Sequence, residues 1–274
     1  MAMRENSANG TESASQMAED RNGQGFSADQ NLLQDLVTAN HILYDQGVLD
    51  AFGHVSVRHD KHPDRFLLAR NMAPALVSTE DIVEFDLDGA PLNAAGRRVY
   101  LERFIHGEIY RARPDVIAVV HSHSPSVVPF SVVKKTPFRA VCHMAGFIGT
   151  GTPNFDIRDV AGDGTDLLIT SNELGKALAK TLGEKTVVLM RGHGSTVVAD
   201  SLKKAVYRAV YTEVNARTQA EASRLGDVTF LSEAEAESTV RTIETQVIRA
   251  WDFWKPKAAA TSAALSKQLG AFAK

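Results

Sequence analysis

The stretch AVVHSHSPSVV, residues 118–128, places two histidines at the end of a run of β-forming residues. Residues two apart in an extended chain point to the same face, so His121 and His123 present both imidazoles to one space. Two neutral imidazoles on one face can hold a metal ion, but an isolated pair is as typical of a polar turn after a strand. A metal site therefore needs further ligands elsewhere in the chain.

The best third ligand is His193, in the segment LMRGHGSTVV at residues 189–198. Catalytic zinc usually takes three protein ligands and leaves one position open. Glycines on both sides of His193 allow a sharp turn and a close approach of other groups. Alone, Gly-His-Gly is more often just a turn; together with the histidine pair it predicts a site built from His121, His123 and His193.

A carboxylate, Glu102, lies nineteen residues before His121, near the start of a predicted helix. A carboxylate in the first turn of a helix commonly caps free amides and complements the helix dipole. This helix leads directly into the strand that carries the histidine pair, so its N-terminus can also lie beside the metal. We expect Glu102 to join the site.

The hydrophobic pattern predicts one α/β domain over residues 27–254, between a disordered tail at 1–26 and a flexible tail at 255–274. Apolar residues at helical spacing predict helices at 27–47, 100–115, 124–133, 201–226 and 232–253. Runs of β-formers between Gly, Pro and Asp predict strands at 54–59, 65–70, 81–89, 116–124 and 138–144, with two more within 186–200.

Composition excludes several classes of partner. A net charge of −3 over 274 residues gives no basic surface for nucleic acid or an anionic membrane. The N-terminus lacks the apolar core of a signal peptide, and the chain has no apolar run long enough for a membrane span. The single cysteine, Cys142, cannot form an internal disulfide. We therefore expect a cytoplasmic protein.

The spacing E–x18–H–x–H, followed by GHG, resembles the class II aldolase/adducin family, as do GHVSVR, RPDVIAVVHSHSPSVV and AVYRAVYTEVNAR. The resemblance spans residues 30–225. It implies a three-layer αβα fold with a central, mostly antiparallel sheet, and homotetramers with active sites between subunits. It also implies one divalent metal per subunit on the three histidines, zinc first, with Mn, Co or Fe as alternatives. Glu102 then serves as acid/base, and the retained ligands favour an enzyme over an adducin-like module.

The chain departs from the sugar-phosphate aldolases where they bind phosphate. Tyr100 and Leu101 replace a serine pair, and His54 replaces an asparagine. LARNM at residues 68–72, with Arg70 at or near the position, replaces a Thr-Gly phosphate loop. Phosphate favours several small donors, whereas the guanidinium fork of Arg70 suits a carboxylate. We predict that Arg70, His54 and Tyr100 bind an unphosphorylated carboxylate; a surface ion pair for Arg70 and core packing for Tyr100 are the alternative interpretation.

These departures make the chain more similar to the family's decarboxylases of hydroxylated aromatic or heteroaromatic carboxylic acids. A metal acting as Lewis acid serves both branches, because each breaks a C–C bond and leaves a carbanion that a proton quenches. We predict a metal-dependent lyase, and first among lyases such a decarboxylase. An aldolase acting on an unphosphorylated hydroxy-oxo acid is the first alternative, and an iron-dependent oxygenase is the second.

His143, in AVCHMAG, falls close to a tyrosine that aldolases extend into a neighbouring subunit's site. It is a candidate second proton donor, with a buried structural histidine as the alternative. The histidines at positions 41, 59, 62 and 106 are interpreted as helix-surface or loop residues without a role.

Overall fold

Seven strands form a single sheet within residues 28–272, the part of the chain that the computed structural model describes. The strand order is β3-β2-β1-β4-β7-β6-β5, and every neighbouring pair is antiparallel except β5 and β6. The mostly antiparallel sheet is thereby confirmed. The strands are β1 His54–Arg58, β2 Arg65–Ala69, β3 Ile82–Asp86, β4 Ala118–Ser122, β5 Asn154–Phe155, β6 Val187–Met190 and β7 Gly194–Ala199.

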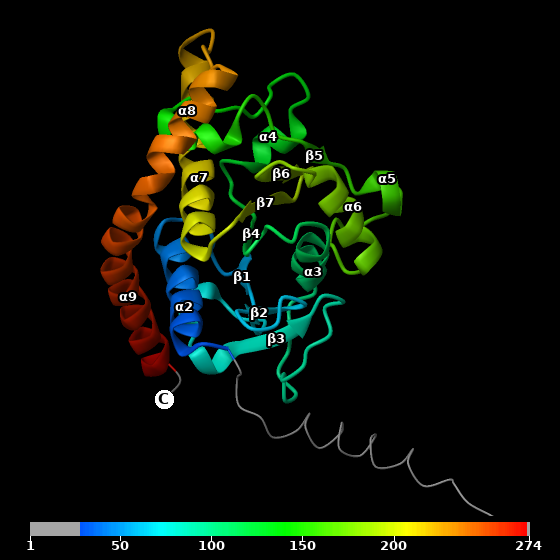
Figure 1. Cartoon of the computed structure of the whole chain (residues 1–274), viewed down its shortest axis with the longest axis vertical. Helices are drawn as coiled ribbons and strands as arrows, with labels where there is room; N and C mark the ends of the chain where they lie inside the picture. The colour runs from blue at the N-terminus through cyan, green and yellow to red at the C-terminus, as the bar shows by residue number, and fades with distance from the viewer. Residues whose placement is uncertain (1–27, 273–274) are drawn as a thin grey trace, which may run out of the picture.

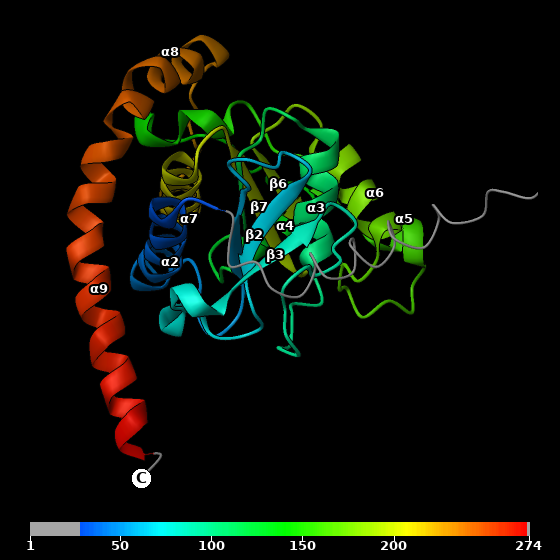
Figure 2. The ribbon, with the colours of Figure 1, turned by 60° about the horizontal axis from the view of Figure 1, so that its bottom comes forward.

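Helices cover both faces of this sheet (Figures 1 and 2). On one face, α2 and α7 contact the central strands and α9 packs outside them; on the other, α3 and α6 pack together and contact the sheet. The three-layer αβα prediction is confirmed. The helices are α2 Gln30–Asp45, α3 Arg103–Ala112, α4 Val128–Val132, α5 Arg158–Ala161, α6 Asn172–Leu182, α7 Leu202–Leu225, α8 Glu233–Ile243 and α9 Val247–Phe272, with 3-10 turns η1 Pro74–Leu76, η2 Thr79–Asp81, η3 His143–Ile148 and η4 Glu244–Gln246.

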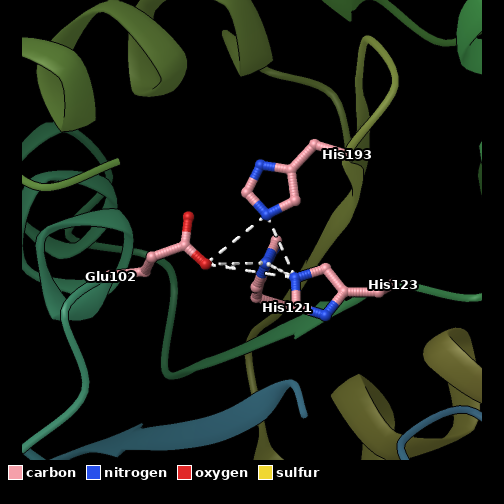
Figure 3. A group of neighbouring side chains, drawn as sticks. All are labelled: Glu102, His121, His123 and His193. Atoms are coloured by element: carbon pink, nitrogen blue, oxygen red, sulfur yellow. Dashed lines mark hydrogen bonds and ion pairs between the residues drawn. The ribbon is translucent and has the colours of Figure 1, made fainter. Parts of the chain in front are cut away.

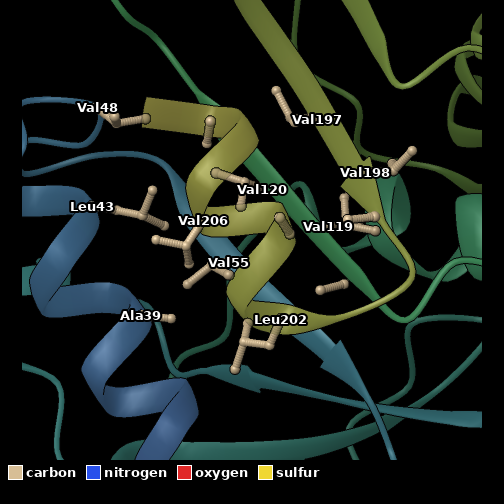
Figure 4. Close-up of a cluster of buried hydrophobic side chains, with 14 of the residues drawn as sticks. Ala39, Leu43, Val48, Val55, Val119, Val120, Val197, Val198, Leu202 and Val206 are labelled. Atoms are coloured by element: carbon tan, nitrogen blue, oxygen red, sulfur yellow. The ribbon is translucent and has the colours of Figure 1, made fainter. Parts of the chain in front are cut away.

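The core lies between the central strands and the α2–α7 layer (Figure 4). Every residue of β4 and β7 is buried, and apart from His121 both strands consist of apolar and small residues. Val120 and Val197 meet Leu43 of α2 and Val206 of α7 in this core. Each such side chain contributes about 1.5–3 kcal/mol by burial, so the strand ends that carry the histidines are held by a rigid base.

The expectation of a flexible tail over residues 255–274 is wrong, because α9 continues to Phe272. Ala258 and Ser262 are buried, and the Ser262 hydroxyl donates to the Ala75 carbonyl at 2.6 Å. Lys257 and Thr261 both contact the Asp45 carboxylate at the end of α2. These contacts hold the helix past Pro256, which removes one backbone donor from it. The domain therefore extends beyond residue 254.

The strand predicted at 138–144 is not formed. Instead, side-chain amides of α7 bond to the backbone of this extended segment: Asn215 accepts from Val141 N–H and donates to Arg139 O. Gln219 accepts from Arg139 N–H in the same way. The strand prediction is therefore wrong: the backbone of residues 139–141 bonds to a helix face rather than to a neighbouring strand, and His143 begins the 3-10 helix η3.

Two further expectations concern the chain ends and membranes. The predicted disordered tail at 1–26 lies outside the described residues. Within residues 28–272, none of the helices is both long and apolar enough to cross a membrane.

Candidate metal centre

The histidine pair lies where β4 ends, as the sequence predicts. His121 belongs to the strand and is fully buried, whereas His123 follows it and keeps 32% of its side chain exposed. Their Nε2 atoms are 3.0 Å apart and their rings meet edge to face. Both imidazoles therefore point into one space (Figure 3), and His123 is the more exposed of the two.

His193 reaches the same space from the turn between β6 and β7. Its Nε2 atom lies 3.0 Å from Nε2 of His123. The flanking glycines are required by geometry: Gly192 has φ of +65°, and a Cβ on Gly194 would lie 2.1 Å from Ser122 O. Only glycine lets this turn lie against the end of β4, which brings the third imidazole to the pair.

Glu102 closes the group from the fourth side. It occupies the N-cap position of α3, but its side chain makes no capping bond. Oε1 accepts from Ile169 N–H at 3.0 Å, while Oε2 lies 3.5 Å from Nε2 of His121 and 3.4 Å from Nε2 of His193. The capping interpretation is thus wrong, and the carboxylate points into the site (Figure 3). We call Glu102, His121, His123 and His193 the ligand cluster.

The donor set of the ligand cluster fits a divalent cation. One ligand atom from each residue lies within 4.8 Å of all the others. Tetrahedral zinc with Zn–N bonds of 2.0–2.1 Å separates its nitrogens by about 3.3 Å, close to the 3.0 Å contacts seen here. A neutral imidazole has one N–H, so Nε2 of His123 cannot bond to both neighbouring nitrogens. A cation satisfies all three nitrogens together.

Protonation states favour the same conclusion. Burial, together with His121 and His193, lowers the pKa of His123 to about 4, and burial also lowers the pKa of His121. Burial alone would raise the pKa of Glu102, but hydrogen bonds and charge from His121 and His193 outweigh it and hold that pKa well below its usual range. At neutral pH His121 and His123 are therefore neutral imidazoles and Glu102 is an ionised carboxylate, the forms that bind metals.

The structure places two of the predicted substrate-binding residues beside the ligand cluster. His54 of β1 pairs in register with His121, and their ring centroids are 5.1 Å apart. The Tyr100 ring lies 4.6 Å from that of His54, and its hydroxyl donates to Met72 O at 2.5 Å. Both side chains are buried. They form the wall of the site next to His121.

Arg70 lies next to this wall. Burial raises the pKa of Tyr100 to about 12, and the nearby charge of Arg70 opposes part of this rise. Its Nε donates to Asp81 Oδ1 at 2.6 Å, and 37% of the side chain is exposed. Arg70 thus makes the ion pair that the alternative interpretation foresaw, and its role in carboxylate binding stays a prediction.

The sequence interpretation missed His106, which was assigned to the surface. It is fully buried, and its Nε2 lies 2.6 Å from Nδ1 of His54. The available signal was helical spacing: His106 and Tyr110 lie one position after Ile105 and Ile109, on the same buried side of α3. A polar residue on that side of a helix signals a buried network.

Comparison with known proteins assigns the family. Residues 34–220 match the class II aldolase and adducin N-terminal domain. The chain belongs to this family.

Curated class II relatives include decarboxylases. The chain is 39% identical over 245 residues to decarboxylase tropJ of Talaromyces stipitatus, covering 81% of this chain and 92% of the relative. It is 33% identical over 184 residues to the 3,4-dihydroxyphthalate decarboxylase of Rhodococcus jostii, covering 63% of this chain and 70% of the relative. With the family match, these relatives identify the protein as an enzyme, a lyase.

A solved class II structure shows the same fold. The L-fuculose 1-phosphate aldolase structure superposes with a TM-score of 0.66 at 20% identity, covering 79% of this chain and 98% of that one. The predicted class II aldolase fold is thereby confirmed.

His143 lies apart from the ligand cluster in this class II chain. It begins η3 and lines a surface cavity with Tyr207, Tyr211 and Trp254 of α7 and α9. The side chain is exposed, so the buried structural alternative is wrong. Its role as a proton donor stays a prediction.

Proposed function

We propose that the protein is a divalent-metal-dependent decarboxylase of a hydroxylated aromatic or heteroaromatic carboxylic acid. The observation that carries the proposal is the complete ligand cluster in a chain 39% identical to decarboxylase tropJ. The 3,4-dihydroxyphthalate decarboxylase relative supports this substrate class by its name.

The three histidines of the ligand cluster would hold one divalent ion, with zinc favoured by the three-nitrogen donor set. When bound, the ion supplies Lewis-acid stabilisation of negative charge on the substrate oxygens. Burial of His121 and His193 keeps water from two sides of the site, and the partly exposed His123 marks the side from which substrate enters.

Glu102 would move the proton. Ile169 N–H holds Oε1, which leaves Oε2 directed at the site. Because Glu102 is ionised, it first accepts the proton of the substrate hydroxyl. The bond between the ring carbon and the carboxylate carbon then breaks, carbon dioxide leaves, and the electron pair stays on the ring carbon. Glu102 returns the proton to that carbon, and solvent reprotonates the hydroxyl oxygen.

The wall beside His121 would select the substrate. Tyr100 and His54 present ring faces to an aromatic ring, and Arg70 would bind a carboxylate through the terminal nitrogens that its Asp81 pair leaves available. Leu101, 59% exposed next to Glu102, adds apolar surface and no donor for phosphate. This composition favours a planar carboxylate over a sugar phosphate.

We further propose a homotetramer with active sites between subunits. His143 is exposed, so it is available to a neighbouring subunit's site, where it would act as a second proton donor. Its pairing with another subunit is tested by mixing inactive His143→Ala and Glu102→Gln chains, which would restore activity only if the two residues act across subunits.

The substrate test uses the full chain loaded with zinc, manganese or iron. We expect carbon dioxide release from 3,4-dihydroxyphthalate or a hydroxybenzoate, with one proton consumed per turnover. Release of an aldehyde from a hydroxy-oxo acid, with no carbon dioxide from any aromatic acid, would make the protein an aldolase. Oxygen consumption coupled to turnover by the iron-loaded chain alone would make it an oxygenase.

A further inference from the structure

A buried chain of polar groups leads from α3 to His54. Tyr110 Oη lies 2.7 Å from Ser56 Oγ, Ser56 Oγ lies 2.6 Å from Nδ1 of His106, and Nε2 of His106 lies 2.6 Å from Nδ1 of His54. His54 and Ser56 share one face of β1, while His106 and Tyr110 share one face of α3. All four residues are buried. We call them the relay.

The distances favour one of the two directions in which the relay can donate. Tyr110 has one hydroxyl hydrogen and two acceptors in reach, Ser56 Oγ at 2.7 Å and Ile117 O at 3.4 Å. The shorter distance is the optimum for O–H···O, and Ile117 O already accepts from Arg58 N–H at 2.7 Å. On this basis we assign Tyr110 as the donor to Ser56, and Ser56 as the donor to Nδ1 of His106.

The same logic sets both histidine tautomers. With Nδ1 accepting, neutral His106 carries its hydrogen on Nε2 and donates it to Nδ1 of His54. Neutral His54 must then carry its hydrogen on Nε2. Among residues 28–272 that nitrogen has no hydrogen-bond partner, and the His54 ring lies against Tyr100 and His121 at the site wall.

We propose that the relay holds His54 as a donor whose Nε2–H binds an anionic oxygen of the substrate, with His106 as the positioning residue. The inference rests on the proposed function, which supplies an anionic aromatic substrate next to His121. Reversal of the relay would leave a bare Nε2 lone pair facing that anion and repel it. The relay thus adds to the proposed carboxylate site a hydrogen-bond donor of fixed orientation beside the metal ligands.

The first test is NMR of the zinc-loaded full chain labelled with 15N-histidine, with His54 and His106 signals assigned by substitution. The proton shared by the two rings should show its one-bond coupling to Nε2 of His106. His54 should carry its single ring N–H proton on Nε2. A shared proton bonded to Nδ1 of His54 would overturn the proposal. This measurement needs no substrate.

The second test measures binding of 3,4-dihydroxybenzoate to zinc-loaded variants. His106→Leu removes the donor to His54 and should weaken binding about tenfold, the effect of one buried hydrogen bond. His106→Gln can still donate from its amide and should stay within about threefold of the wild type. In the wild type, the probe should also shift the Nε2–H signal of His54. Equal losses in both variants, or no loss in either, would refute the positioning role.

Two outcomes separate this inference from the proposed function. If 3,4-dihydroxybenzoate fails to bind at all, the substrate class and the role of His54 toward it both fail, whereas the NMR measurement still judges the relay itself. If His106→Leu does not fold, Ser56→Ala takes its place: the shared proton should then distribute over both rings and binding should weaken. An unchanged proton position in Ser56→Ala contradicts the direction assigned to the relay.

Discussion

The ligand cluster and the relay are two histidine groups a few ångströms apart, and they differ in what can fill the short contacts between their atoms. In the relay, each short contact can be filled by one hydrogen between a donor and an acceptor. In the ligand cluster, Nε2 of His123 faces two other Nε2 atoms at 3.0 Å. Hydrogens cannot fill both contacts, but a cation can.

Burial alone does not distinguish the two groups, since His121 and His106 are both fully buried. What differs is whether like atoms converge. Convergence of acceptors around an ionised carboxylate marks an ion site, while alternation of donors and acceptors marks a hydrogen-bonded support. Substitutions in each group test this difference.

The largest effect is expected for His121→Ala. Loss of a buried ligand should strip the metal and abolish activity, because only two of the three histidine ligands then remain beside Glu102. Metal content by elemental analysis and turnover are the measurements, with circular dichroism to check the fold. His62→Ala, on a half-exposed loop, is the control and should change neither. Full metal occupancy with turnover in His121→Ala would show that the cluster is not the metal site.

Glu102→Gln should lower turnover about a hundredfold while metal content and thermal stability stay near wild type, because the amide keeps the contact to Ile169 N–H but carries no proton for transfer. Glu108→Gln is the matched control, a buried carboxylate on the same helix that bonds to Asn172 instead. It should stay within a few-fold. A similar loss in both variants would mean that Glu102 supports α3 rather than the chemistry.

Arg70 lies outside both groups, so its substitution should change substrate affinity alone. A charge-assisted bond to a carboxylate contributes roughly 1.5–3 kcal/mol. Arg70→Ala should therefore raise KM about ten- to a hundredfold, and Arg70→Lys less, because lysine keeps the charge but loses the fork. Metal content should not change. Equal losses for a carboxylate ligand and its neutral amide would remove Arg70 from the binding site.

Stability should depend on pH through the relay. Burial first, and then the charge of His121, lowers the pKa of His106 to about 3, against 6.5 in the unfolded chain. Between these values the unfolded state binds the extra proton, so stability falls as pH falls from 6.5. Between pH 7 and 5, the metal-free wild type should lose about 2 kcal/mol more than His106→Gln.

Urea unfolding of both proteins at the two pH values measures this difference. His62→Gln serves as the control and should follow the wild type. A pH dependence that is the same in wild type and His106→Gln would mean that His106 does not stay neutral in the folded chain.

The smallest effect is expected at Thr196, whose hydroxyl lies 3.4 Å from Nδ1 of His121. Groups that orient a metal-binding histidine typically contribute ten- to a hundredfold in affinity, but this contact is long and Ser195 backbone also bonds to the ring. Thr196→Val should weaken zinc affinity by no more than about tenfold, measured by competition with a chelator. A hundredfold loss would make Thr196 the main support of His121.

Much of the site could be predicted from local sequence. Alternation along β4 placed His121 and His123 on one face, and the glycines around His193 predicted its turn. Glu102 was harder, because a capping carboxylate and a ligand carboxylate occupy the same position in a helix. Only the bond from Ile169, distant in sequence, separates the two.

The wrong predictions share a cause, because in each one the structure of the segment depends on a bonding partner from another part of the chain. The segment 138–144 bonds to amides of α7, and α9 continues because Asp45 and Ala75 of distant elements bind it. His106 was missed because its donors and acceptors come from β1. Pattern and propensity describe a segment alone and carry no information on such partners.

The position of the ligand cluster in the strand order has a kinetic consequence. His121 and His123 meet His193 only when β4 has paired with β7, as in the pair Val119 with Val198. Contacts between residues so distant in sequence give high contact order, and chains with such topology fold slowly. Capture of zinc during refolding would therefore report when the middle of the sheet has closed, long after the helices have formed.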